Sequence, residues 1–407
     1  MMASVPKAGE GGQGAFIATE SKPQLIRSGP QELPRAPVED SPWRAYVPIA
    51  ASVAVWIVFA WSTNGIFLTP RNFSNLMRQT AVTAMLAVGM LLVMLVGQID
   101  LSVGSIAGLA GISAVMVQAG LHTGFLMSLL TGLIAGFVVG IVQGSLVAYA
   151  RIPSLVVTLG GLLIWRGLAK GMSGGNTYPI EVRAFKRIGQ AYLSPTAGIF
   201  VIIVGVAAAA WLAIRANRER VAKGAVAWSP LAFLLRVLGP AALIAVFVLA
   251  LNEYAGVPVP VLLAAGIALA VAFVLGSTGF GRNLYSIGAR PERESEMNAP
   301  MQVLWVFAVM GGMAALTGMI LAASVGSAAP DAGSLLEIDA IAAAVIGGAS
   351  FGGGRGTVLG ACLGAFLMAS LDNGMSLKNV PDFAQEIVKG GILISAVGLD
   401  HFGRFRK

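Results

Sequence analysis

Charged residues are scarce in this chain, and so are the residue types that most often carry out catalysis. Only 11% of the 407 residues are Asp, Glu, Lys or Arg, against about 25% in soluble domains. Two histidines, His122 and His401, and one cysteine, Cys362, provide no Ser/His/Asp arrangement, no Cys/His spacing and no metal-ligand cluster. A single cysteine cannot form an internal disulfide, and its apolar surroundings are typical of a small buried thiol. We therefore expect neither an enzyme nor a metal-binding protein.

The chain also lacks a nucleotide-binding loop. The glycine-rich stretch 347–356 does not end in Gly-Lys-Ser/Thr, and that pattern occurs nowhere else in the sequence. A tight, irregular connection between two membrane segments accounts for its glycines. The sequence thus predicts no ATP hydrolysis and no cofactor in this chain.

Apolar residues, in contrast, are abundant and come in long runs. They make up 56% of the chain, and the mean hydropathy is +0.80. At about 20 residues per span, the chain has room for about 10 to 12 membrane segments, some of which we expect to be broken or re-entrant. The sequence therefore predicts an all-α, polytopic transmembrane helical bundle. The expected segments are 47–69, 80–97, 101–120, 125–149, 153–169, 198–215, 230–251, 257–277, 302–325, 338–354, 356–373 and 384–400.

The ends of the chain differ from this apolar middle. Residues 1–45 are rich in Gly, Pro, Ser and Glu and lack a sustained apolar run, which predicts a disordered cytoplasmic tail. The first apolar run begins near Val47, too deep for a cleavable signal peptide, so we expect it to remain as an anchor. The predicted organisation places a transmembrane domain at 46–401 between this tail and a basic cytoplasmic tail at 402–407.

Basic residues indicate an orientation for a multi-pass protein of the cell (inner) membrane. With both termini in the cytoplasm, Arg151, the basic cluster in 215–223, the segment 278–301 and the C-terminal tail all lie inside, as the positive-inside rule requires. The net charge of +8 and the pI near 9.9 follow from these flanking residues and not from a nucleic-acid-binding face. One loop, 170–196, does not fit, because its basic residues would lie outside. They are Lys170, Arg183, Lys186 and Arg187.

One aspartate, Asp100, stands between two apolar runs in the stretch VGQIDLSVGSIAGL. A carboxylate next to a membrane segment is costly unless protein or water surrounds it, so Asp100, with Gln98 and Ser102 beside it, is a candidate for a translocation path. A similar polar break, Glu337-Ile338-Asp339-Ala340, occurs late in the chain and makes Asp339 a second candidate. Corresponding breaks in two halves are typical of an internal repeat in transporters. Helix N-capping, alone or combined with a lining role, also explains both aspartates, so both interpretations stay open.

Glycines recur at every fourth position in several segments. Such rows let helices approach closely in lipid, where hydrophobicity no longer drives association. We expect tight packing of helices within one subunit, with a dimer seam as the alternative. The glycines expected to pack helices are Gly132, Gly136, Gly140 and Gly144 in one segment, and Gly356, Gly360 and Gly364 in another.

The segment 278–301 is the largest charge-dense insertion between apolar runs. Its Asn-Ala-Pro ending fits a short helix that closes before the next span. On the cytoplasmic side it would either dock onto a soluble partner or tether two helices as a solvated loop, and composition favours neither.

Four stretches of the chain resemble the permease subunits of monosaccharide ABC importers of the ribose and xylose group. They are VGQIDLSVGS, TGFGRNLYSIGARPE, EIDAIAAAVIGGASFGGGRGTVLGACLGA and LDNGMSLKNVPDFAQEIVKGGIL, and the resemblance extends from about Pro48 to Asp400. It implies the membrane-spanning subunit of an ATP-driven importer that carries a pentose, D-xylose before ribose, other sugars or nucleosides, into the cytoplasm. It further implies a homodimer, cytoplasmic ATP-binding subunits that bind the ATP, and an external sugar-binding protein. Asn373, in the run LDNGMS, joins the path candidates.

The same resemblance identifies 278–301 as the contact with the ATP-binding subunit. The family's coupling pattern, GxNxxAARxSG, has an alanine pair and a small-residue turn, whereas this chain continues from Gly288-Ala289-Arg290-Pro291 into charged residues. A co-varied partner and a chain specialised away from standard coupling are both consistent with that departure. The residues expected to couple are Gly281, Arg282, Tyr285, Gly288, Arg290, Glu292, Arg293, Glu294 and Glu296.

A second class of function remains open from the residues alone. In an ion-coupled secondary transporter or channel, Asp100 and Asp339 would carry the coupling ion. A neighbouring gene that encodes a nucleotide-binding loop would favour ATP-driven import, whereas an isolated gene would favour ion coupling.

Overall fold

A computed structural model describes residues 47–222, 224–289 and 298–405, and it confirms the predicted helical membrane bundle. Among these residues, nine helices are long and apolar enough to cross a membrane. The predicted tail 1–45, residues 290–297 of the predicted coupling segment and the last two residues lie outside the described part. Arg290, Glu292, Arg293, Glu294 and Glu296 therefore have no described position.

The N-terminal third of the bundle contains two segments that the sequence pattern placed differently. Helix α2 begins at Pro70, ten residues before the expected start, because Thr69 caps it by accepting a hydrogen bond from the Asn72 N–H. Polar residues lower the hydropathy of its first turns, so the sequence pattern did not assign these turns to the span. The first expected segment divides into α1 and a short 3-10 helix. The elements are α1 (Val47–Ser62), η2 (Ile66–Leu68), α2 (Pro70–Leu95), α3 (Val103–Leu121), α4 (Phe125–Ala148) and α5 (Ser154–Ser173).

The middle of the chain contains the loop that did not fit the charge rule. It forms the short helix α6 (Arg183–Gln190), which buries Phe185 and Gly189 and exposes Arg183 and Arg187. An eight-residue amphipathic helix is too short to appear as a span, so the hydropathy pattern gave no sign of it. The other elements are β1 (Tyr178–Pro179), β2 (Tyr192–Leu193), α7 (Pro195–Ala222), α8 (Pro230–Asn252), β3 (Val257–Pro258), α9 (Val259–Ser277) and α10 (Gly279–Ala289).

The C-terminal part contains the second polar break and the glycine-rich connection. Residues between α12 and α13 form no regular element, and four of their glycines have positive φ, from +70° to +136°. That irregular backbone agrees with the interpretation of the glycine-rich stretch. The elements are α11 (Ala299–Val325), β4 (Ser327–Ala328), α12 (Leu336–Ile346), α13 (Val358–Leu377) and α14 (Asp382–Phe405).

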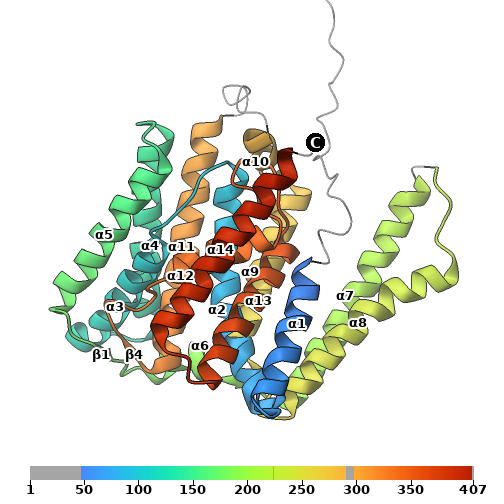
Figure 1. Ribbon diagram of the computed structural model, residues 1–407, viewed down its shortest axis with the longest axis horizontal. Coiled ribbons are helices and arrows are strands. Elements are labelled where there is room, and N and C mark those ends of the chain that lie inside the picture. Colours follow the sequence, from blue (N-terminus) through green and yellow to red (C-terminus); the bar gives the residue numbers. More distant parts are fainter. Residues whose placement is uncertain (1–46, 223, 290–297, 406–407) are drawn as a thin grey trace, which may run out of the picture. The chain divides into compact units, whose positions relative to one another are not determined.

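Two small antiparallel ladders join distant loops. Strand β1 pairs with β4, Tyr178 opposite Ala328, and β2 pairs with β3, Tyr192 opposite Pro258. Figure 1 shows β1, β4 and α6 at the end of the bundle away from α10. The ladders therefore fasten one end of the bundle, while α10 lies at the other.

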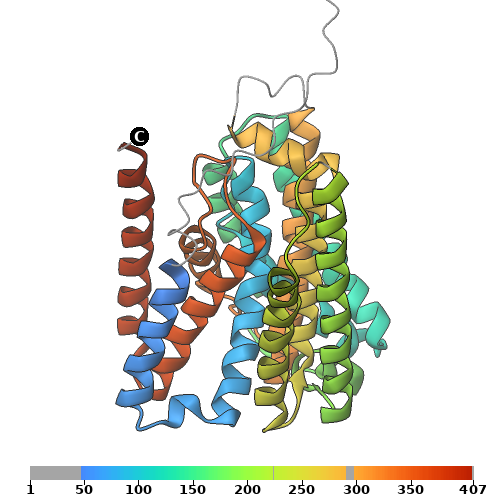
Figure 2. The same cartoon turned by 90° about the vertical axis from the view of Figure 1, so that its right-hand side faces the viewer.

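Three spans of moderate hydropathy form the core, and two strongly apolar spans lie outside it. Helices α2, α3 and α11 have mean hydropathies of 1.5 to 2.0 and are mostly buried, whereas α7 and α8, at 2.6 and 2.4, are mostly exposed. Helices α7 and α8 form a hairpin beside the other helices (Figure 1 and Figure 2). This order suits a membrane, because lipid solvates exposed apolar side chains while small and polar residues pack helices together.

The glycine rows lie where helices touch. In α4, Gly132, Gly136, Gly140 and Gly144 all face α11, where an added Cβ would meet backbone or Met319. In α13, Gly360 and Gly364 face the backbone of α12 at Gly347 and Ala343, and Gly356 precedes the helix with a φ of +136°. All of these contacts lie within one chain.

Candidate functional site

The break between α2 and α3 buries Asp100 in a cluster of neutral polar groups. The Oδ1 atom of Asp100 accepts hydrogen bonds from the Ser102 N–H at 2.8 Å and from the Ser102 hydroxyl at 2.6 Å. The same hydroxyl oxygen accepts a bond from the Gln143 side chain of α4 at 3.0 Å. Ser154 and Thr158 of α5 bond the Ile99 backbone, at 3.3 and 3.4 Å. This cluster holds the irregular backbone before α3 against α4 and α5.

Of the three path candidates in this break, two lie in the cluster. Asp100 is 1% exposed and Ser102 is fully buried, whereas Gln98 is half-buried and its backbone N–H bonds back to Val93 in α2. Asp100 accepts the N–H of Ser102, the residue directly before the helix, so it closes the turn that leads into α3. The geometry is that of a local anchor for the broken segment.

At the second break, the chain that leads into α12 is held by an arginine that the sequence analysis did not single out. Arg166 of α5 donates to the Asp331 carbonyl at 2.8 Å and to the Ser334 hydroxyl at 2.6 Å, and its Nε bonds Ser105 at 3.3 Å. Leu335, with a φ of +68°, then leads into α12. The first turn of this helix carries two buried carboxylates, Glu337 and Asp339. Arg166 therefore fixes the chain just before these carboxylates.

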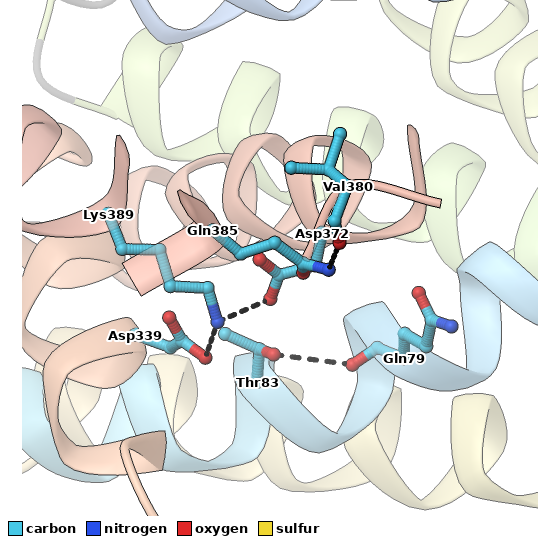
Figure 3. A network of polar contacts seen from close by, with 7 residues as sticks. All are labelled: Gln79, Thr83, Asp339, Asp372, Val380, Gln385 and Lys389. Atoms are coloured by element: carbon cyan, nitrogen blue, oxygen red, sulfur yellow. Dashed lines mark hydrogen bonds and ion pairs between the residues drawn. The ribbon is translucent and has the colours of Figure 1, made fainter. Parts of the chain in front are cut away.

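Asp339 belongs to a buried ion triad (Figure 3), which we define as Asp339, Asp372 and Lys389. The Lys389 ammonium of α14 lies 3.0 Å from Asp339 Oδ2 of α12 and 2.9 Å from Asp372 Oδ2 of α13. The side chains are 14% exposed for Lys389, 5% for Asp339 and 26% for Asp372. Two carboxylates against one ammonium leave a net charge of −1. The triad depends above all on Lys389, because removing this cation leaves two carboxylates close together without a counter-charge.

The ion triad still has unused hydrogen-bonding capacity. Within the described residues, the Oδ1 atoms of Asp339 and Asp372 are buried without a hydrogen-bond donor. On the facing helix α2, the Gln79 side-chain oxygen is also without a partner, and Thr83 donates only a 3.3 Å bond to the Gln79 carbonyl (Figure 3). Buried acceptors without donors are costly, which makes the neighbourhood of the triad suited to a molecule that brings hydroxyl groups or to water.

Asn373 extends this polar region along α2 and α13. The Asn72 side chain of α2 donates to Asn373 Oδ1 at 2.8 Å, and both side chains are buried. Asn72, Gln79 and Thr83 are spaced by seven and four residues, so they share one face of α2. We call the line formed by Asn72, Asn373, Gln79, Thr83 and the ion triad the polar seam.

The predicted coupling residues that the structure describes form a contact between α10, the break after α2 and the glycine-rich connection between α12 and α13. Gly288 packs against the end of α2 at Leu95 and against Gly353 and Gly354, and an added Cβ at Gly353 would also meet Gly97. The Tyr285 hydroxyl donates to the Gly356 carbonyl at 2.9 Å, and burial raises the pKa of this phenol, which keeps it a donor. Gly281 packs against the end of α9, and Arg282 is exposed.

Sequence reasoning found Asp339 and Asn373 but missed Asp372, Lys389 and Arg166. Asp372 and Lys389 lie in LDNGMSLKNVPDFAQEIVKGG, which reads as a polar end of one span followed by the start of another. Their pairing is visible only once α14 packs on α12. A charged residue inside an expected span was the available signal for all three: Arg166 in 153–169, Asp372 in 356–373 and Lys389 in 384–400.

Comparisons with known proteins agree with this architecture. Residues 72–397 match the family described as "Branched-chain amino acid transport system / permease component". The xylose transport system permease protein XylH of Escherichia coli (strain K12) is 43% identical over 363 residues, which cover 88% of this chain and 91% of that protein. Its counterpart from Haemophilus influenzae is 40% identical over 88% of this chain and 96% of that protein.

More distant relatives are named for the transport of other compounds. The ribose import permease protein RbsC of Escherichia coli (strain K12) is 31% identical over 87% of this chain and 92% of that protein. No solved structure matches the chain. Because the family match covers most of the helical bundle and these relatives match almost end to end, the chain belongs to the permease-component family of ABC transport systems.

Proposed function

We propose that this chain is the membrane-spanning permease subunit of an ATP-driven sugar importer whose cargo is D-xylose. The observation that carries the proposal is the 43% identity, over nearly the whole of both chains, to a permease named for xylose transport. The polar seam supports it, because an apolar bundle that buries acceptor atoms along one line offers hydroxyl-bearing cargo a route that lipid does not. The multi-pass bundle resides in the inner membrane with both termini in the cytoplasm.

The polar seam is the translocation route in this proposal. Asp339 and Asn373, both path candidates from the sequence, lie in it, and Asp372 and Lys389 join them. Asp100 and Ser102 have a different role: they hold the break between α2 and α3 in place. Gln98 lies beside this cluster, half-buried, and has no part in the route. Two copies of the chain pair in the complete importer, as the family resemblance implies.

The energy source in this proposal is ATP bound by a separate cytoplasmic subunit. The chain has no phosphate-binding loop of its own. Helix α10 is the contact for that subunit, because it touches the end of α2 and the glycine-rich connection after α12 together. A displacement of α10 thus acts on the end of α2 and on the connection between α12 and α13. An external sugar-binding protein delivers the cargo at the opposite end.

Transport in proteoliposomes tests this function. The permease is reconstituted with its ATP-binding subunits and sugar-binding protein, and radiolabelled D-xylose uptake is followed with ribose, other pentoses, hexoses and nucleosides as competitors. We expect uptake that needs enclosed ATP and the binding protein, that resists ionophores and that D-xylose competes for best. Uptake that persists without ATP and collapses with an ionophore would instead establish the ion-coupled alternative.

A further inference from the structure

A hollow of about 360 Å³ opens at the end of α2 that lies away from α10. It is lined by the first turns of α2, by Tyr192 of β2 and by Tyr254 after the end of α8. Its size falls within the range of about 300–1,000 Å³ that is usual for small-molecule sites. We call it the entry cavity.

The side chains in the entry cavity are arranged and partly held in place. Arg78 donates to Asn75 Oδ1 at 3.2 Å, and its guanidinium lies 5.7 Å from the centre of the Tyr192 ring. The Tyr192 and Tyr254 rings meet edge to face, with centres 6.2 Å apart. These contacts orient a guanidinium, an amide and two aromatic rings toward the same small volume.

This combination fits the chemistry of a monosaccharide. A sugar hydroxyl both donates and accepts hydrogen bonds, and amide side chains such as Asn75 can do the same, while Arg78 donates only. The apolar C–H face of a sugar ring packs on tyrosine rings, whose hydroxyl ends tolerate water. A phosphate has no apolar face and would leave the tyrosine rings unused. Of the described residues that line the cavity, none is a carboxylate.

The entry cavity borders the polar seam, because Asn72 belongs to both. Asn72 lines the cavity and donates to Asn373 at 2.8 Å, and Asn373 is the neighbour of Asp372 in the ion triad. A ligand in the cavity therefore lies one side chain away from the proposed route.

We propose that the entry cavity binds one monosaccharide before it enters the polar seam, with Asn75 and Arg78 bonding hydroxyl groups and Tyr192 and Tyr254 packing against the ring. This assignment rests on the proposed function, because it takes D-xylose as the cargo. It adds a sugar site on the permease itself, separate from any site on the external binding protein.

Direct binding measures this site without the transport cycle. Full-length permease in nanodiscs, without the binding protein, is examined by saturation-transfer NMR with D-xylose. We expect transfer to the sugar's C–H protons. Asn75→Ala and Tyr254→Ala should each raise the Kd about two- to tenfold, as expected for the loss of one neutral hydrogen bond or a comparable contact. Tyr254→Phe keeps the ring and should stay near the wild-type Kd.

Controls separate the possible failures. Lys186→Ala, at α6 and outside the cavity lining, should leave the Kd unchanged. If Asn75→Ala does not reach the membrane, Asn75→Ser is measured in its place. No transfer to D-xylose in the wild type, an equal Kd in all variants, or displacement of the sugar by inorganic phosphate would each overturn the assignment. Uptake by wild-type proteoliposomes, measured in parallel, shows whether the proposed function itself stands.

Discussion

Asp100 and Asp339 occur in nearly the same short pattern, yet their surroundings differ. Asp100 precedes its helix and bonds the backbone and hydroxyl of Ser102, two residues away. Asp339 lies inside the first turn of its helix and pairs with Lys389, fifty residues away on another helix. Among the described residues, each aspartate has one buried oxygen without a donor, so the two differ in the partner of the other oxygen: neutral donors of Ser102 for Asp100 and the charged Lys389 for Asp339.

The difference separates an anchor from a route. Neutral hydrogen bonds that begin and end within a few residues stabilise a break in a helix without needing access to water. A buried ion triad, in contrast, is costly to assemble and is not needed to hold a helix end. The triad's excess negative charge and its place beside the polar side chains of α2 and α13 favour a role in handling cargo.

The largest effect is expected from removing the one cation of the triad. Lys389→Met leaves Asp339 and Asp372 facing each other without a counter-charge, which should cost about 3–5 kcal/mol. We expect little folded protein in membranes and a lower unfolding temperature in detergent. Lys378→Met, at an exposed lysine that bonds the Ser62 carbonyl, is the matched control and should behave like the wild type. Equal stability of both variants would contradict the triad's structural dependence on charge.

Separating the helices of the triad should have the next largest effect. In Gly364→Leu the new side chain meets the Ala343 backbone of α12, and overpacking of this kind costs about 1–3 kcal/mol. The folded yield should fall. Gly390→Leu on α14, where an added Cβ meets nothing within 4 Å, should fold normally. Full expression and activity of Gly364→Leu would show that α12 and α13 need not touch.

Exchanging one carboxylate for an amide at each break compares the two aspartates directly. Asp339→Asn removes an ion pair in the proposed route, so transport per folded molecule should drop strongly. Asp100→Asn keeps an oxygen that can accept from Ser102, so it should cost only about 0.5–1.5 kcal/mol and retain transport. Uptake is normalised to membrane expression. Loss of transport in Asp100→Asn with wild-type transport in Asp339→Asn would reverse the two roles.

Asp100→Ala completes this comparison. It removes the acceptor for Ser102 altogether, so folded yield should fall while transport per folded molecule stays near the wild type. Wild-type yield in Asp100→Ala would show that the break does not depend on this anchor.

The smallest effect is expected where α10 meets the glycine-rich connection between α12 and α13. Tyr285→Phe removes the bond from α10 to the Gly356 carbonyl, worth about 0.5–1.5 kcal/mol. Stability should change little. The amount of sugar transported per ATP hydrolysed should fall, because α10 then lacks its hydrogen bond to the connection between α12 and α13. An unchanged coupling ratio would indicate that Tyr285 has no part in coupling.

The sequence predicted the helical bundle well because apolar runs are long and polar residues interrupt them at few places. It predicted the start of α2 poorly, since Arg71, Asn72 and Arg78 lower the hydropathy of a helix that Thr69 and Pro70 begin. It missed α6, because eight residues with three basic side chains resemble a loop. Local pattern thus suffices for spans but not for polar elements at the bundle ends.

The candidate site was accessible to sequence reasoning only where a single residue was conspicuous. Asp100 and Asp339 stood out as isolated carboxylates, but their different environments depend on packing: Ser102 beside one and α14 beside the other. Asp372 and Lys389 were hidden in a polar stretch, and Tyr192 and Tyr254 come together only through the β2–β3 ladder. These contacts join residues far apart in the chain, which no local pattern encodes.

The central claim, that cargo passes along the polar seam and not past Asp100, is tested most directly by cysteine labelling. In a Cys362→Ser background the chain has no other cysteine, so Thr83→Cys in the seam and Ser102→Cys in the anchor can be labelled singly. Both hydroxyls are buried at rest, 6% and 0% exposed. A small water-soluble thiol reagent is applied to proteoliposomes during ATP-driven transport. The account predicts that Thr83→Cys reacts during turnover and is protected by D-xylose, while Ser102→Cys stays unreactive. Reaction and sugar protection at Ser102→Cys with none at Thr83→Cys would contradict it.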